Sequence, residues 1–149
     1  MSEKLTAVDE SLLETIADMP GGKTTGAYNI RKDSGCASRA TTENIDIRSK
    51  TDKPGIDIII KPGTKNEVCH IPVIITKTGL SEMVYNDFYV GEGSDVTIIA
   101  GCGIHNCGGE ESRHDGVHTF YIGKGARVTY VENHYGEGSG EGKNVMNPT

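Results

Sequence analysis

Two stretches of the chain are near copies of each other, and this repeat constrains the fold more than any other feature. Residues 89–99 read YVGEGSDVTII and residues 121–131 read YIGKGARVTYV, which is an offset of 32 residues. Each copy contains a hydrophobic strand end, a Gly-x-Gly turn and a second strand with alternating side chains. Glycines supply the positive φ angles that a tight turn needs. A unit of this kind cannot bury its apolar face alone, so the repeat predicts units that stack on one another.

The rest of the chain is also rich in strand patterns. Isoleucines alternate with other residues over 45–48 and over 56–60, and a turn at 61–64 separates the second run from an apolar stretch at 68–75. This segment is a weak third copy of the strand–turn–strand unit. Sandwiches, cupin-like barrels and β-helices all show such patterns, but the repeated turn favours an all-β stack of the β-helix type. Further strands are expected at residues 83–90, 95–100, 117–122 and 126–132.

The N-terminal segment has a different pattern. Residues 3–19 carry apolar side chains at helical spacing, and a Pro-Gly-Gly sequence at 20–22 ends the pattern. We expect a short helix and linker over residues 1–22 and a β core over residues 23–149. The helix is expected to cap one end of a sheet, and the alternative is that it touches a partner. The Gly-rich segment 136–144 is flexible in composition, and the pattern indicates no terminal element after it. We therefore expect this core to be truncated at its C-terminus.

Composition and charge restrict the classes of function. The 149 residues include two Phe and no Trp, so the core must come from Ile, Val and Tyr, which favour strands. The net charge of −6 argues against a nucleic-acid-binding or anionic-membrane surface. No stretch has the apolar length of a membrane span or a signal peptide, which predicts a soluble, cytoplasmic protein. Four cysteines in such a protein are expected to be thiols or ligands rather than disulfides.

The densest group of reactive side chains lies between the two repeats. Cys102, His105 and Cys107 fall within six residues, and flanking glycines allow the backbone to bring them together. Cysteine and histidine are ligands that zinc, iron and iron–sulfur clusters prefer. The spacing matches no recognised zinc motif, so the alternative is a buried small cysteine beside a turn histidine. Cys102 has a second role open to it, because a thiol near imidazoles can form a thiolate that accepts sulfur as a persulfide.

More histidines follow this group. If residues 114–118 are extended, His114 and His118 share one face, and both become further candidates to bind a metal or cluster. Acidic and imidazole side chains nearby can orient such ligands through hydrogen bonds. Three residues are candidates for this orienting role: Asp115, Glu132 and His134.

Three segments carry a resemblance to a known family. Residues 101–138 read GCGIHNCGGEESRHDGVHTFYIGKGARVTYVENHYGEG, residues 26–31 read GAYNIR, and residues 143–148 read KNVMNP. Together they resemble the SufB/SufD family of iron–sulfur cluster assembly proteins, over about residues 26–149. The chain looks like the shorter, single-domain branch of that family. The resemblance implies a right-handed parallel β-helix, and a scaffold component rather than an enzyme.

The resemblance also implies partners and a cargo. SufB/SufD-like subunits pair as homo- or heterodimers through their β-helices and bind a SufC-like ATPase through C-terminal helices. A cysteine desulfurase or sulfur-transfer protein supplies sulfur, and transient iron–sulfur clusters form at the subunit interface. The family's sulfur-accepting cysteine lies in a Gly-Cys pair at a strand end, so Cys102, after Gly101, is the candidate sulfur acceptor. The family's cluster ligands and its ATPase-docking segment are expected beyond residue 149.

Two other interpretations fit the same residues. A cupin-like metal-binding enzyme would use the His, Cys and Glu side chains, although cupins normally carry an H-x-H pair, which this sequence lacks. A purely structural β-stack would instead join a partner through its open strand edges.

Overall fold

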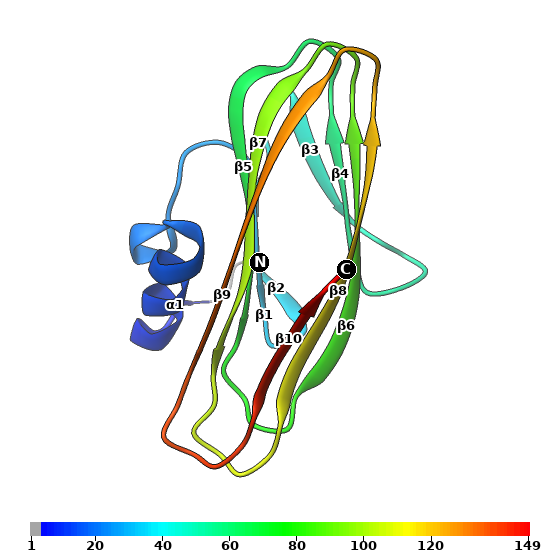
Figure 1. Cartoon of the computed structure of the whole chain (residues 1–149). Helices are drawn as coiled ribbons and strands as arrows, with labels where there is room; N and C mark the ends of the chain where they lie inside the picture. The colour runs from blue at the N-terminus through cyan, green and yellow to red at the C-terminus, as the bar shows by residue number, and fades with distance from the viewer. Residues whose placement is uncertain (1–3) are drawn as a thin grey trace.

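The computed structural model describes residues 4–149 and is mostly β, as the sequence predicts (Figure 1). Two five-stranded sheets face each other, and a short α-helix lies outside them. The elements in chain order are α1 (Ala7–Ala17), a 3₁₀ turn (Pro20–Gly22), β1 (Tyr28–Lys32), β2 (Gly35–Ala40), β3 (Ile45–Ser49), β4 (Gly55–Ile60), β5 (Lys65–Ile75), β6 (Ser81–Val90), β7 (Asp95–His105), β8 (Ser112–Ile122), β9 (Arg127–Glu137) and β10 (Asn144–Pro148). Within residues 4–149, no helix is long and apolar enough to cross a membrane.

From β4 onward the chain passes alternately between the two sheets. Sheet A has the strand order β2–β1–β5–β7–β9, and sheet B has the order β10–β8–β6–β4–β3. Each strand from β6 to β10 pairs in parallel with the strand two positions earlier in the chain. The antiparallel pairs are β1–β2 and β3–β4, at the N-terminal side of each sheet.

The repeated segments lie side by side in register. Tyr89 of β6 is opposite Tyr121 of β8, and their rings stack with centroids 5.0 Å apart. The weak third copy is aligned as well, because Ile60 of β4 is opposite Val90 of β6. The 32-residue offset in the sequence is therefore the distance along the chain from β6 to β8 and from β7 to β9, whereas β4 and β6 are 30 residues apart.

The main core fills the space between the two sheets. Alternate side chains of each strand point inward, and Phe88 is fully buried there, stacked on Phe120 with ring centroids 4.5 Å apart. Isoleucines of both sheets surround this pair, among them Ile58 and Ile98, which are also fully buried. Burial of each side chain of this size contributes about 1.5–3 kcal/mol to folding, which explains the isoleucine at every second position.

Helix α1 covers the outer face of sheet A rather than the end of a sheet (Figure 1). Its buried residues Leu12 and Ile16 lie against Gly103 of β7, where an added Cβ would come within 3.3 Å of the Leu12 side chain. The side chain of Asn133 in β9 donates to the carbonyl oxygen of Ile16 (2.9 Å). The predicted helix is thus present with narrower bounds, and the capping role is wrong because the apolar stripe needs a sheet face to bury it.

A capping box begins this helix. Thr6 Oγ1 accepts from the N–H of Asp9 (3.1 Å), and the Asp9 carboxylate accepts from the N–H of Thr6 (2.9 Å). Thr6→Ala is expected to lower the free energy of unfolding by about 1 kcal/mol, because one helix N–H loses its acceptor. Urea denaturation measures this loss. A loss below the error of that experiment would show that water replaces the cap.

Several boundaries differ from the sequence-based expectation. β7 extends to His105 and β8 begins at Ser112, so Cys102 and His114 lie within strands. Glycines hide the alternation in β7, and an inward histidine hides it in β8. The strand β10 follows the Gly-rich segment, where the sequence indicates no terminal element, and pairs with β8. In that segment a Cβ on Gly138 would collide with the backbone of Asn106, so the glycine reflects close stacking of loops.

Candidate functional site

The loop between β7 and β8 is built around a buried asparagine. The side-chain amide of Asn106 donates to the carbonyl oxygen of Glu110 (2.8 Å), and its side-chain oxygen accepts from the N–H of Gly108 (3.0 Å). Its backbone N–H donates to the carbonyl oxygen of Glu137 in the neighbouring strand (2.9 Å). Asn106 is almost completely buried. These bonds fix the residue that follows, Cys107, at the surface of the turn.

A chain of two side-chain contacts lies on this surface, and we call it the relay. It consists of Cys107, His105 and Glu137. The Sγ atom of Cys107 lies 3.1 Å from Nε2 of His105, and Nδ1 of the same ring lies 2.9 Å from Oε2 of Glu137. His105 and Glu137 are paired directly across β7 and β9. Cys107 is exposed, so reagents in solvent can reach its sulfur. A thiol, an imidazole and an orienting carboxylate in this order are the parts of an activated cysteine nucleophile.

The electrostatics of the relay favour the thiolate. The pKa of Cys107 is lowered, first because the backbone and side chain of Ser139 form hydrogen bonds with its sulfur and also because His105 lies beside it. The pKa of His105 is raised, mainly by its hydrogen bond with Glu137. Both shifts stabilise a thiolate beside an imidazolium, which is the reactive form of such a pair.

Glycines in the 138–142 segment bring Ser139 over Cys107. A Cβ on Gly138 would collide with the backbone of Asn106, and one on Gly140 would collide with the carbonyl oxygen of Gly108. Residues with side chains could not lie so close to the β7–β8 loop. The two Gly-rich loops therefore stack directly, and the hydrogen bonds of Ser139 reach the thiolate.

Cys102 is in a different environment from Cys107. Its side chain points between the sheets and is buried, packed with Val73, Ile75 and Ile104. The pKa of Cys102 is raised, chiefly by burial and further by the negative charges of Glu82 and Glu132. The structure thus separates the two cysteines that the sequence placed in one cluster. Cys102 is a protonated interior thiol in this conformation, and a protein donor cannot reach it.

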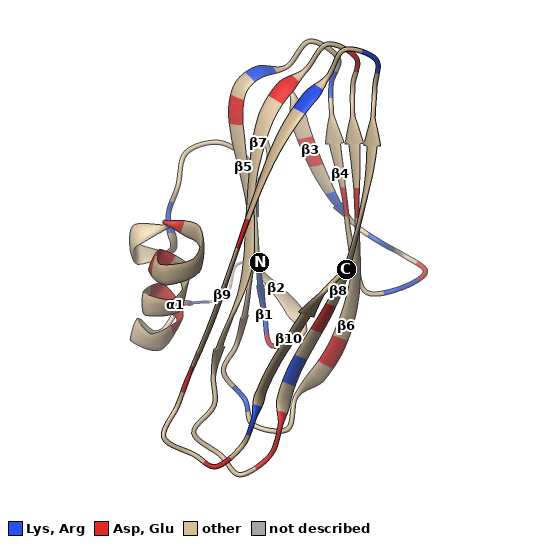
Figure 2. Cartoon of the chain, in the orientation of Figure 1, with Lys and Arg blue, Asp and Glu red and all other residues tan. Residues whose placement is uncertain are grey.

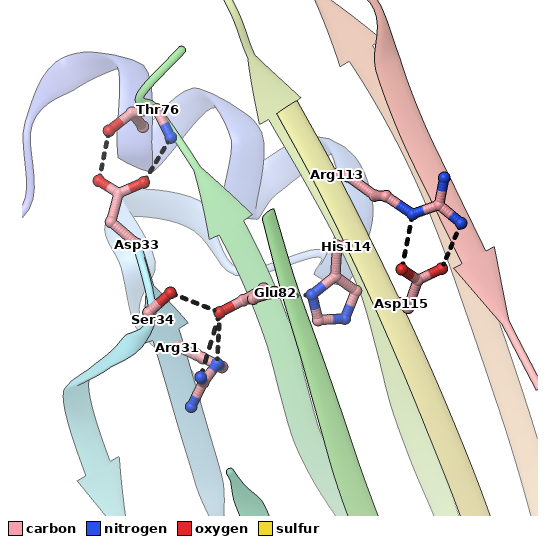
Figure 3. A network of polar contacts seen from close by, with 8 residues as sticks. All are labelled: Arg31, Asp33, Ser34, Thr76, Glu82, Arg113, His114 and Asp115. Carbon is pink, nitrogen blue, oxygen red and sulfur yellow. Dashed lines mark hydrogen bonds and ion pairs between the residues drawn. The ribbon is translucent and has the colours of Figure 1, made fainter. Parts of the chain in front are cut away.

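His114 belongs to a buried polar network inside the sheets (Figure 3). Its Nδ1 lies 2.8 Å from Glu82 Oε1, while Glu82 Oε2 accepts from Arg31 Nε (3.1 Å) and Ser34 Oγ (2.8 Å). The Glu82 side chain is 5% exposed. Burial opposes its ionisation, but the hydrogen bonds from His114 and Arg31 outweigh this effect and lower the pKa of Glu82 to about 2. The network therefore holds an ionised carboxylate in the interior.

A second group, which is partly exposed, contains two more histidines, His118 and His134. Nε2 of His118 and Nε2 of His134 lie 3.3 Å and 3.2 Å from the two carboxylate oxygens of Glu132. Glu132 also accepts from the hydroxyl of Tyr130 (2.9 Å). Cys102, His114, His118, Glu132 and His134 line one narrow cavity of about 10 Å³. His114 and His118 do share an inward face, as their spacing in an extended segment predicts.

Asp115 lies on the opposite face of β8 from these histidines. Its carboxylate accepts two hydrogen bonds from Arg113, at 2.7 Å and 3.2 Å (Figure 3). It is therefore not placed to orient His114 or His118, because successive side chains of a strand point to opposite faces. Glu132 and Glu82 take that position instead.

Acid should weaken the fold through Glu132. Hydrogen bonding from His118 is the largest cause that lowers the pKa of Glu132, from 4.5 to about 2. A lowered folded-state pKa gives stability above pH 4.5 that is lost as the pH falls toward 2. We expect the free energy of unfolding to fall by about 2 kcal/mol more in wild type than in Glu132→Gln between pH 5 and pH 3. Urea denaturation at both pH values measures this. An equal loss of stability in wild type and Glu132→Gln would contradict the prediction.

No three or more Cys, His, Asp or Glu side chains in residues 4–149 are arranged to hold a metal ion. The five residues that the sequence suggests as metal ligands lie in two places. His105 and Cys107 belong to the exposed relay, whereas Cys102, His114 and His118 face the space between the sheets. Sequence reasoning missed Glu82, Asn106, Glu137 and Ser139, and three of these lie outside the cysteine-rich run. A signal for two of them exists: Glu137 follows His105 by 32 residues, and His114 follows Glu82 by the same interval.

Comparison of the chain with models of known protein families, with curated proteins and with solved structures gave no match. The site is therefore interpreted from its own geometry.

Proposed function

We propose that this protein is a scaffold component for iron–sulfur cluster assembly that receives sulfur on Cys107. The observation that carries the proposal is the exposed sulfur of Cys107, 3.1 Å from a histidine that Glu137 orients. The resemblance of the central run to the SufB/SufD family supports it independently of this geometry. Iron and sulfide are cargo in this proposal, and the protein catalyses no reaction of its own.

The sulfur-transfer step needs only a persulfide donor. The thiolate of Cys107 attacks the outer sulfur of the donor, a new S–S bond forms on Cys107, and the S–S bond of the donor breaks. The donor leaves as a thiolate, so electrons and charge balance without an oxidant. Residues near the sulfur have matching roles: His105 and Ser139 stabilise the attacking thiolate, and Glu137 holds the imidazole in place.

This proposal moves the acceptor from Cys102 to Cys107. The resemblance favours Cys102, which follows a glycine at a strand end as the family's acceptor does, but its thiol is buried and its pKa is raised. A cysteine desulfurase or a sulfur-transfer protein is the partner that the chemistry requires. A SufC-like ATPase and a second SufB/SufD-like subunit remain partners proposed from the resemblance.

We further propose that the fold is a parallel β-helix of two-sheet cross-section. The parallel pairing of each strand from β6 to β10 with the strand two positions earlier supports this architecture. A cupin-like barrel is disfavoured, because barrels of that class are built from antiparallel strands. The absence of converging metal ligands in residues 4–149 also removes the main support for a cupin-like enzyme.

Anaerobic cluster assembly tests the function. Wild type, Cys107→Ser and the control Cys36→Ser would be incubated with Fe²⁺, a cysteine desulfurase, cysteine and dithiothreitol, which reduces persulfide sulfur to sulfide. The bound iron and acid-labile sulfide would then be measured. Cys36 is also exposed but lies on β2. We expect wild type and Cys36→Ser to bind both elements and Cys107→Ser to fall to the background. Equal loading of all three proteins would refute the role of Cys107.

A further inference from the structure

A cavity of about 610 Å³ opens between the sheets on the side of the two hairpins, and Cys107 does not line it. Unequal strand lengths produce the opening. β4 begins at Gly55, opposite Tyr85 of β6, whereas β6 itself begins at Ser81. Residues 81–84 therefore have no strand neighbour on this side, and the interior is open to solvent. Sites for small molecules commonly have volumes of about 300–1,000 Å³.

The cavity has an apolar floor and a basic rim. The floor includes Ile56, Ile71, Val73 and Val84. The basic side chains of the lining are Arg31, Arg39, Lys50 and Lys53, and the acidic one is Glu82. In a protein with a net charge of −6, this lining is a local concentration of positive charge. Figure 2 shows basic segments on both sides of an acidic one in the loop that projects between β3 and β4.

Two of the four cations are already neutralised. Arg31 pairs with Glu82 at 3.1 Å, and Lys50 lies between two aspartates, with its Nζ 2.7 Å from the carboxylate of Asp87. Their charges are satisfied inside the protein. They therefore shape the rim but leave little attraction for a ligand.

Within residues 4–149, Arg39 and Lys53 have no acidic partner of this kind. Among the described residues neither forms an ion pair: Arg39 donates from Nε to Asn29 Oδ1 (2.7 Å) and from Nη2 to Ser49 Oγ (2.9 Å). Lys53 Nζ lies 4.6 Å from the centre of the Tyr85 ring. Neutral acceptors on β1 and β3 thus hold the Arg39 guanidinium in a fixed orientation without cancelling its charge. A fixed guanidinium is suited to bind a carboxylate or phosphate through two hydrogen bonds.

We propose that this cavity binds a small organic anion, an apolar body that carries one phosphate or carboxylate group. Arg39 binds the anionic group, Lys53 adds charge from the loop between β3 and β4, and the apolar body lies on the isoleucine and valine floor. This site does not include Cys107, so the two proposals can be tested separately.

Isothermal titration with three matched probes tests the site: 1-naphthyl phosphate, 1-naphthoate and the neutral 1-naphthylmethanol. We expect at least one anion to bind ~10-fold or more tightly than the neutral probe. Arg39→Gln should weaken that binding ~10-fold, and Lys53→Gln, in an exposed loop, should weaken it less. Arg48→Gln is the matched control, because Arg48 is exposed and paired with Asp46 on β3. It should leave binding unchanged.

Alkylation of Cys36 locates the bound probe. Cys36 lines the cavity and is exposed, so the anion that binds should slow its reaction with iodoacetamide and leave Cys107 unaffected. The proposal fails if neither anion binds wild type, if Arg39→Gln and Lys53→Gln both bind like wild type, or if binding occurs without protection of Cys36. The probe that binds, 1-naphthyl phosphate or 1-naphthoate, identifies the anionic group that the site prefers.

Discussion

Glu82→Gln is expected to lower the free energy of unfolding at pH 7 by about 3 kcal/mol. The substitution keeps the shape of the side chain but removes the charge that Arg31 and His114 share in the interior. Removal of one partner from a buried ion pair leaves the other charge uncompensated, which costs about 3–5 kcal/mol. The lowered pKa of Glu82, from 4.5 to about 2, corresponds to a stabilisation of about 3 kcal/mol.

An exposed ion pair supplies the control for this prediction. Asp46 and Arg48 form a contact of 2.6 Å, but their side chains are 44% and 69% exposed. Asp46→Asn should therefore leave stability unchanged within the error of urea denaturation. If the two variants lost similar amounts of stability, the interior network would not be an important source of stability.

His105→Gln is expected to slow the alkylation of Cys107 at pH 6.5 severalfold. The hydrogen bonds of Ser139 lower the pKa of Cys107 most, and the imidazole of His105 lowers it further, so the variant loses part of its thiolate. Glu137→Gln should have a smaller effect in the same direction, because it acts through the raised pKa of His105. Rates are measured with iodoacetamide over a series of pH values.

Cys36 in the same molecule is the internal control for this experiment. It is exposed on β2 and has no contact with the relay; its sulfur lies 3.5 Å from Asn29 Oδ1. Its rate should be the same in wild type and in both relay variants. A parallel fall at Cys36 and Cys107 would mean that the substitutions disturb the whole fold, and an unchanged rate at Cys107 would contradict the relay.

The fold could be predicted from the sequence where apolar residues carry the pattern. The isoleucines of 56–60 and the two copies of the Gly-x-Gly turn predict strands and turns that the structure contains, in register. The extension of β8 could not be predicted, because His114 and Gly116 stand at inward positions where apolar residues are expected. The inward histidine is stable there only because Glu82 lies opposite.

The candidate site was only partly predictable for the same reason. His105 and Cys107 are close in sequence and meet in space, so local spacing found them. Their third partner, Glu137, lies one strand further in the same sheet, and only the 32-residue period connects it to His105. Whether Cys102 faces the interior depends on which alternate residues of β7 point inward, that is, on the phase of the strand. The glycines around it hide that phase, because they carry no side chain.

Direct mapping of transferred sulfur tests the central claim most directly. Wild-type protein would be treated anaerobically with a cysteine desulfurase and cysteine, and persulfide on each of the four cysteines would be located by peptide mass spectrometry after trapping. The account predicts that sulfur appears first on Cys107, and that His105→Gln slows its appearance. First labelling of Cys102 or Cys36, or no persulfide on Cys107, would contradict it.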